Sequence, residues 1–284
     1  MSELLVPFAY DYMVKAMWVS ALVGATCAFL SAFLMLKGWS LMGDALAHSI
    51  VPGVAGAYLL KLPYATGAFA AGLLAALGMA FVRSQTRLRE DAVIGLVFTS
   101  FFAAGLLIVS INPTSVNVQS IVLGNILGIS DEDAFQVVAI SAVTLAVLLF
   151  KWKDFVVVFF DEAHARSVGI NPFWFKVVFF TLLSAATVAA LQTVGACLVI
   201  AMVVTPGATA YLLTDRFGVL LVIAVAIGSV TSFVGAYLSY FVDGATGGVI
   251  VTLQTLVFLA AFYGAPKHGV LAARRRVRVG DQLK

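Results

Sequence analysis

Long apolar stretches separated by short polar segments run along almost the whole chain. A membrane-spanning helix needs about 20 mostly apolar residues, and the pattern predicts nine such segments, of which the seventh is short and contains Pro206. Eight spans remain possible, because that seventh segment is below the usual length. The expected fold is all-α, a polytopic transmembrane helical bundle in one domain over residues 1–284. The predicted spans are Val14–Leu36, Leu41–Leu60, Pro63–Val82, Ala92–Ile111, Ala134–Phe150, Phe173–Ala196, Leu198–Leu213, Phe217–Val242 and Gly247–Gly264.

The composition places the chain in the membrane class as well. Hydrophobic residues make up 62% and charged residues 11%, whereas soluble domains carry about 25% charged residues. The first apolar run follows Asp11 and Lys15 and is long enough to span, which predicts an anchor rather than a removable signal peptide. Cys27 and Cys197 lie singly in apolar runs, so we expect buried small side chains rather than a disulfide or a metal motif.

Positive charge predicts the orientation in the membrane. With the N-terminus outside and the C-terminus in the cytoplasm, 15 of the 17 lysines and arginines fall on the inner side, and only Lys15 and Lys61 lie outside. This asymmetry is the one that cytoplasmic loops show. The basic tail Arg274–Arg278 is then expected near anionic lipid rather than on nucleic acid. Outer acidic residues could attract cations, although the run Ser130–Asp133 is more typical of a helix N-terminus.

Asp44 and His48 form an isolated polar pair within the second predicted span. Of the 14 acidic residues and three histidines, only these two fall inside a span, where an ionisable group costs a few kcal/mol. At positions i and i+4, both side chains project from one helix face. A carboxylate and an imidazole can together bind a divalent cation. The alternative is that Asp44 caps the helix and His48 donates to a carbonyl, but the isolation of the pair favours a metal site.

Two helix breaks suggest a transport pathway. Pro52 follows the Asp/His pair and is itself followed by Gly53 and Gly56, while Thr205 and Pro206 lie in the seventh span. Broken helices line ion sites in transporters, so Pro52, Thr205 and Pro206 are candidate pathway residues. The alternatives are a plain kink, glycines that allow close helix packing, and threonines that bond to their own helix.

The two longest loops are predicted to contain helices of their own. In the cytoplasmic loop Lys151–Pro172, a short helix is expected to start at Asp161 and end at Gly169. It could insert into a groove of a soluble partner or lie on the lipid surface. The outer loop Asn112–Asp133 is expected to carry a short surface helix over Ile121–Ile129.

Several catalytic signatures are absent from the sequence. No glycine precedes a lysine, so the chain has no G-x-x-x-x-G-K-[ST] loop and does not bind ATP by that route. The H-E-x-x-H and G-x-S-x-G motifs of hydrolases are absent as well. These absences disfavour an intramembrane hydrolase, which would also need a third metal ligand and a general base.

Three segments resemble the signatures of bacterial metal-ion ABC transporter permeases of the manganese, iron and zinc type. They are Leu41–Val54, Ala201–Arg216, and Gln254–Leu259 together with Ala265–Gly269. The resemblance extends from about Trp18 to Arg276. It implies a permease that works as a homodimer or heterodimer, with cytoplasmic ATPase subunits below and an extracytoplasmic metal-binding protein above.

The resemblance also assigns roles to single residues. Asp44 and His48 match the buried Asp and His of the family, and Glu162, Ala163 and Gly169 match the short coupling helix that docks in the ATPase. A proline at position 52 is more similar to the manganese and chelated-iron branch of the family than to the zinc branch.

We therefore expect the membrane permease subunit of an ABC importer for divalent transition metals, manganese first and iron second. It would be a multi-pass protein of the bacterial cytoplasmic (inner) membrane that catalyses no chemistry and holds no permanent cofactor. The alternative is a self-contained secondary carrier or channel in which Asp44 and His48 are ion and proton sites. The coupling-like loop and the lack of other acidic residues in the spans argue against it.

Overall fold

The computed structural model describes residues 3–86, 88–111 and 126–265, and the regular structure in these ranges is helical. This confirms the all-α class. The predicted surface helix over Ile121–Ile129 lies mostly outside the described residues. The helices are η1 (Glu3–Ala9), α1 (Asp11–Lys37), α2 (Ser40–Ser49), α3 (Val51–Leu59), α4 (Tyr64–Gln85), α5 (Glu90–Ile111), η2 (Ile126–Gly128), α7 (Asp131–Phe160), α8 (Glu162–Ser167), α9 (Pro172–Val194), α10 (Ala196–Leu213), α11 (Phe217–Val242) and α12 (Thr246–Gly264).

Seven of the described helices are long and apolar enough to cross a membrane, namely α1, α4, α5, α7, α9, α11 and α12. The apolar part of α10 is shorter. The second predicted span is divided into α2 and α3. Counting α10 and the α2–α3 pair as crossings gives the nine segments that the hydrophobic pattern predicted.

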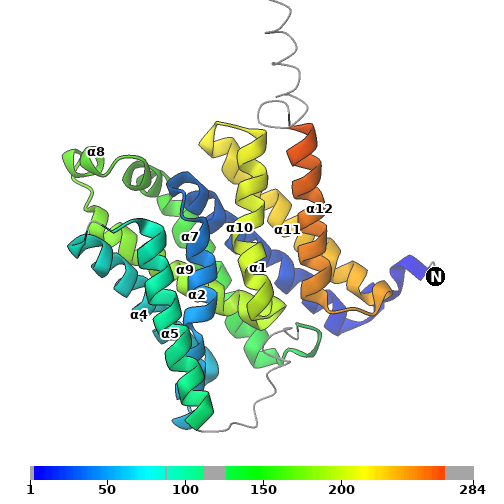
Figure 1. The fold of residues 1–284 in the computed structure, drawn as a ribbon. Helices are drawn as coiled ribbons and strands as arrows, with labels where there is room; N and C mark the ends of the chain where they lie inside the picture. The colour runs from blue at the N-terminus through cyan, green and yellow to red at the C-terminus, as the bar shows by residue number, and fades with distance from the viewer. Residues whose placement is uncertain (1–2, 87, 112–125, 266–284) are drawn as a thin grey trace, which may run out of the picture.

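Helix α1 is the central element of the bundle. It packs against α7, α9, α10 and α11, while α2 to α5 lie together on one side and α10 to α12 on the other (Figure 1). Helix α1 itself carries apolar, buried side chains on all sides, as expected for a helix enclosed by other helices. Cys27 is fully buried on it, as predicted; the side chain of Cys197 lies outside the described part.

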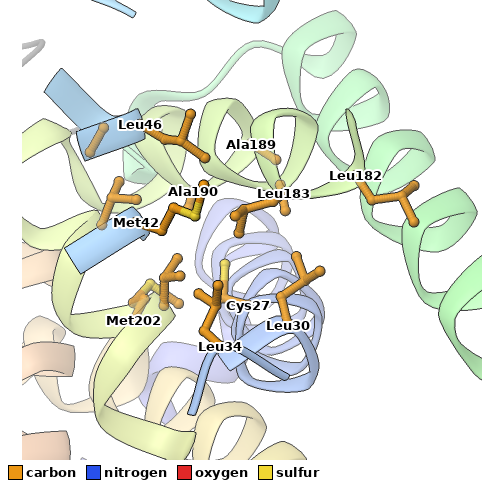
Figure 2. Packing of buried hydrophobic residues seen from close by; sticks show 14 of the residues in the cluster. Cys27, Leu30, Leu34, Met42, Leu46, Leu182, Leu183, Ala189, Ala190 and Met202 are labelled. Atoms are coloured by element: carbon orange, nitrogen blue, oxygen red, sulfur yellow. The ribbon is translucent and has the colours of Figure 1, made fainter. Parts of the chain in front are cut away.

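Four helices meet in the core around the C-terminal half of α1. Leu30 and Leu34 of α1 lie near Met42 and Leu46 of α2, with side chains from α9 and Met202 of α10 completing the cluster (Figure 2). The α2 helix is thereby fixed against α1, α9 and α10 along its apolar face. This packing sets the position of the opposite face, which carries polar side chains.

Helix α7 extends beyond the end predicted for it. The prediction placed a loop from Lys151, but the helix continues to Phe160. Phe155 and Phe159 explain the extension, because their rings lie 6.0 and 5.9 Å from the ring of Phe33 in a buried aromatic cluster. Aromatic pairs at such distances stabilise packing beyond simple burial. The lysines that suggested a loop are exposed on the same helix.

Long-range ion pairs link helices at both ends of the bundle. Lys15 of α1 pairs with Asp131 of α7 at one end, and Lys37 at the other end of α1 lies near Glu162 of α8. The topology derived from positive charge placed the first pair outside and the second pair inside. Each pair therefore joins residues that were predicted to lie on the same side.

Candidate functional site

Asp44 and His48 face each other on α2. The His48 Nε2 and Asp44 Oδ1 atoms are 3.4 Å apart, and the side chains are 28% and 39% exposed, respectively. Helix α2 begins at Ser40 with Trp39 at its N-cap position, so Asp44 is not the capping residue. The structure thus brings a carboxylate oxygen and an imidazole nitrogen to one accessible point, as the i, i+4 spacing predicted.

Two phenylalanines of α5 enclose the imidazole. The ring centroids of Phe98 and Phe102 lie 5.4 and 5.6 Å from that of His48. They restrict the orientation of the ring and shield one side of it from water. The sequence shows these residues one turn apart in an apolar run, but nothing in it pairs them with His48.

The described residues of one chain offer only part of a metal coordination shell at this point. Within the described residues, no group of three or more His, Cys, Asp or Glu side chains could hold a metal ion together. Transition metals usually take at least four ligands. Asp44 and His48 can therefore supply two ligands, with the others coming from water or from another protein chain.

The break after this pair follows from Pro52. Helix α2 ends at Ser49, and α3 begins at Val51 with Pro52 in its first turn. Proline has no N–H to donate to the carbonyl of residue 48, which ends the regular hydrogen-bond ladder. The His48 carbonyl thereby loses its i+4 donor and accepts instead from the Ile50 N–H.

The second proline leaves its helix continuous, because α1 supplies hydrogen bonds beside it. Helix α10 runs through Pro206, where the Ser31 hydroxyl donates to the Val204 carbonyl and accepts from the Gly207 N–H, both at 3.0 Å. The sequence alone does not show this role of Ser31, because a serine in an apolar run carries no sign of its distant partner.

Helix α2 lies against the proline-containing α10 next to the Asp/His pair. A Cβ atom on Gly43, next to Asp44, would be 2.9 Å from Val203 of α10. The Thr209 hydroxyl donates to the Thr205 carbonyl at 2.7 Å, so this threonine bonds to its own helix. The pathway role of Pro52, Thr205 and Pro206 stays a prediction.

Helix α8 has well-defined ends. The Asp161 carboxylate accepts from the N–H groups of Ala163 and His164 at 2.8 and 3.1 Å, and these bonds hold the pKa of Asp161 below its usual value. Gly169 follows the helix in the left-handed region, with φ of +82°, as its position at the end of the predicted helix suggested. Both ends favour one fixed conformation of this short helix.

Glu162 points back into the bundle. Its carboxylate lies 2.7 Å from Lys176 Nζ of α9 and 3.6 Å from Lys37 Nζ of α1. Burial alone would raise the pKa of Glu162, but the hydrogen bond and charge of Lys176, together with the charge of Lys37, hold it below its usual value. Ala163 and His164 are exposed. One side of α8 is therefore anchored, and the other is accessible to a partner.

Comparison with known proteins gives a consistent result over nearly the whole chain. The model of the ABC 3 transport family matches residues 9–265. The chain is 72% identical to the chelated iron transport system membrane protein YfeC of Yersinia pestis, covering 97% of this chain and 94% of the relative. It is 48% identical to the manganese transport system membrane protein MntB of Synechocystis sp., covering 96% of this chain and 90% of the relative.

A solved structure has the same fold. PsaBC from Streptococcus pneumoniae, in complex with Fab, superimposes with a TM-score of 0.84 at 30% sequence identity, covering 96% of this chain and 99% of that chain.

Proposed function

This chain belongs to the ABC 3 transport family and is a multi-pass membrane permease subunit of an ABC transporter; on that premise, we propose that it imports divalent transition-metal ions, manganese first and iron second. It is a transport subunit and not an enzyme. The names of its relatives, which are chelated iron and manganese transport proteins, support this choice of cargo. The observation that carries the proposal is the accessible Asp44–His48 pair on α2.

In this proposal, Asp44 and His48 bind the ion during its passage. The carboxylate suits manganese and iron, while neutral imidazole suits iron and other transition metals. Protons compete for both groups, so binding weakens as the medium becomes more acidic. The neighbouring break at Pro52 leaves the His48 carbonyl without its i+4 donor in the same region.

The remaining ligands come from a second permease subunit. Two facts support this step: the pair is partly exposed, and the described residues offer no third His, Cys, Asp or Glu ligand beside it. In a symmetric pair of subunits, the two copies of Asp44 and His48 would supply four ligands across the interface. A heterodimer needs equivalent ligands on the other subunit.

Helix α8 transmits the action of the ATPase subunits. Its exposed side, with Ala163, contacts the ATPase, and Gly169 sets the direction in which the chain leaves the helix. Glu162 acts from the inner side: its ion pairs with Lys37 and Lys176 pass the movement of α8 to α1 and α9. An extracytoplasmic metal-binding protein delivers the ion at the opposite end.

The metal site is tested with Asp44→Asn and His48→Gln in the permease reconstituted with its ATPase and binding protein. Uptake of radiolabelled manganese, iron and zinc into vesicles is measured. Manganese and iron uptake by each variant should be at least about tenfold lower than by wild type. Asp243→Asn is the matched control, because Asp243 is exposed at the far end of α11. Co-purification of the ATPase at the wild-type level shows that assembly is intact. Wild-type uptake by both variants would contradict the assignment.

The anchor role of Glu162 is tested separately. Glu162→Gln should leave metal binding by the outer partner unchanged but reduce the coupling of ATP hydrolysis to uptake. Lys151→Gln is the control, because Lys151 is an exposed lysine whose pair with Asp154 lies within α7. Equal coupling ratios in the two variants would show that Glu162 does not transmit movement.

A further inference from the structure

A groove with a volume of about 660 Å³ lies beside α8, at the end of the bundle that is predicted to face the cytoplasm. Its walls come from α4, α8 and α9, with contributions from the start of α2 and α5. We call it the basic groove. Its size falls within the range of about 300–1,000 Å³ that is usual for small-molecule sites.

The basic groove carries excess positive charge. The charged residues that line it are Arg83, Arg166, Lys176 and Glu162, so cations exceed acids by two. Glu162 is already paired with Lys176 and with Lys37, and Arg83 lies 5.4 Å from the centre of the Trp39 ring. Among the residues that line the groove, Glu162 is therefore the single acid beside three cations, and it balances only part of their charge.

The remaining lining residues are apolar. Phe180 of α9 is buried, whereas Phe81 of α4 and Phe173 of α9 are 64% and 63% exposed. Both α4 and α9 are helices able to cross the membrane, and these two phenylalanines point away from the bundle core. The groove thus has cations near α8 and apolar walls along two membrane-spanning helices.

We propose that the basic groove binds an anionic phospholipid from the leaflet on the α8 side, with its phosphate near Arg166 and Lys176 and an acyl chain along Leu77 and Phe81. Basic pockets between membrane helices on the cytoplasmic side bind anionic lipid headgroups. A free anion would use the charges but leave the apolar walls empty. A soluble protein segment would have to enter between helices that face lipid. A phospholipid matches the charge and the apolar surface together.

The bound lipid connects α8 to α4. Helix α4 packs against α2 and α3, which carry the Asp44–His48 pair and the adjoining break. A lipid in the groove therefore ties the helix that contacts the ATPase to the half of the bundle that holds the metal site. The binding site itself does not depend on the identity of the cargo.

The test uses the full-length permease, purified and placed in nanodiscs of phosphatidylcholine with increasing phosphatidylglycerol. Lipid retained after transfer to detergent is counted by native mass spectrometry. Wild-type protein should retain phosphatidylglycerol over phosphatidylcholine. Arg166→Gln should weaken this retention about fivefold, which corresponds to about 1 kcal/mol for one cation near a phosphate.

Two further variants separate the groove from general surface charge. Leu77→Trp keeps every charge but fills the apolar part of the groove, so it should also reduce retention. Arg216→Gln removes an exposed arginine at the start of α11, outside the groove lining, and should behave as wild type. Arg166→Lys keeps the charge and should retain phosphatidylglycerol nearly as well as wild type, unlike Arg166→Gln.

Four outcomes would overturn the proposal. They are equal retention by wild type and Arg166→Gln, equal loss in Arg166→Gln and Arg216→Gln, displacement of the lipid by inorganic phosphate alone, and displacement by the ATPase subunit at equal concentration. The third result would assign the groove to a soluble anion, and the fourth would assign it to the protein partner.

Discussion

Gly53 provides a sharp test of how α3 is held beside the Asp44–His48 pair. A Cβ atom added to Gly53 would lie 2.6 Å from both the carbonyl carbon of Gly67 and the Cβ of Ala71, all on the facing surface of α4. Non-bonded carbons normally sit about 3.5–4.0 Å apart. The two helices would therefore have to separate by about 1 Å to accept an alanine. Gly56, on the same helix, has no heavy atom within 4 Å of the equivalent position.

The two glycines form a matched pair of substitutions. In either position, Gly→Ala improves helix propensity by about 1 kcal/mol. Only Gly53→Ala also overpacks the contact with α4, which typically costs about 1–3 kcal/mol. Because the propensity gain is common to both, the difference between the variants isolates the contact. We expect Gly53→Ala to be less stable than Gly56→Ala by about 1–3 kcal/mol.

The assay is the free energy of unfolding in mixed micelles, measured for both variants under the same conditions. Gly67→Ala, on the other side of the contact, should behave like Gly53→Ala, since its Cβ would lie 2.6 Å from Ala57. Gly78→Ala on α4 is its control, because no heavy atom lies within 4 Å there. Equal stability of Gly53→Ala and Gly56→Ala would refute the close α3–α4 packing.

Three other predictions concern α8 and the topology. Gly169→Val should reduce co-purification of the ATPase, because φ of +82° is unfavourable for a β-branched residue, whereas Gly169→Asn should retain most of it; equal yields would contradict the role of this turn. Wild type should melt at a higher temperature than Asp161→Asn, and this difference should be largest at pH values above the usual pKa of an aspartate. It should shrink as the pH falls below about 4, because the native pKa of Asp161 is lowered; a constant difference across pH would argue against it. In a variant without Cys27 and Cys197, a cysteine at position 243 should react with a membrane-impermeant thiol reagent in intact cells and one at position 164 should not; labelling at 164 would place α8 on the wrong side for an ATPase.

The amino-acid sequence determined the class of the protein and the local form of its main motifs. Apolar runs of membrane length form helices in lipid, because a helix satisfies its own backbone hydrogen bonds. The i, i+4 spacing of Asp44 and His48 places both on one face of any helix. The ends of α8 are local as well: the Asp161 cap and the left-handed Gly169 depend on neighbouring residues alone.

Other features depended on contacts between distant segments. Helix α7 continues past Lys151 because Phe155 and Phe159 pack on Phe33, more than a hundred residues away, and local charge cannot reveal such a partner. The inward direction of Glu162 is decided by Lys37 and Lys176 in the same way. Burial of these side chains is a property of the assembled bundle.

The surroundings of the Asp44–His48 pair depend in the same way on both local spacing and distant packing. The sequence identified Asp44 and His48 by their isolation among apolar residues, and proline chemistry predicted the break beside them. Only the tertiary structure placed Phe98 and Phe102 around the imidazole, and only it left the pair partly exposed. Local spacing fixes which side chains share a helix face, because helix geometry is the same everywhere. What that face meets is set by the packing of helices far apart in the chain.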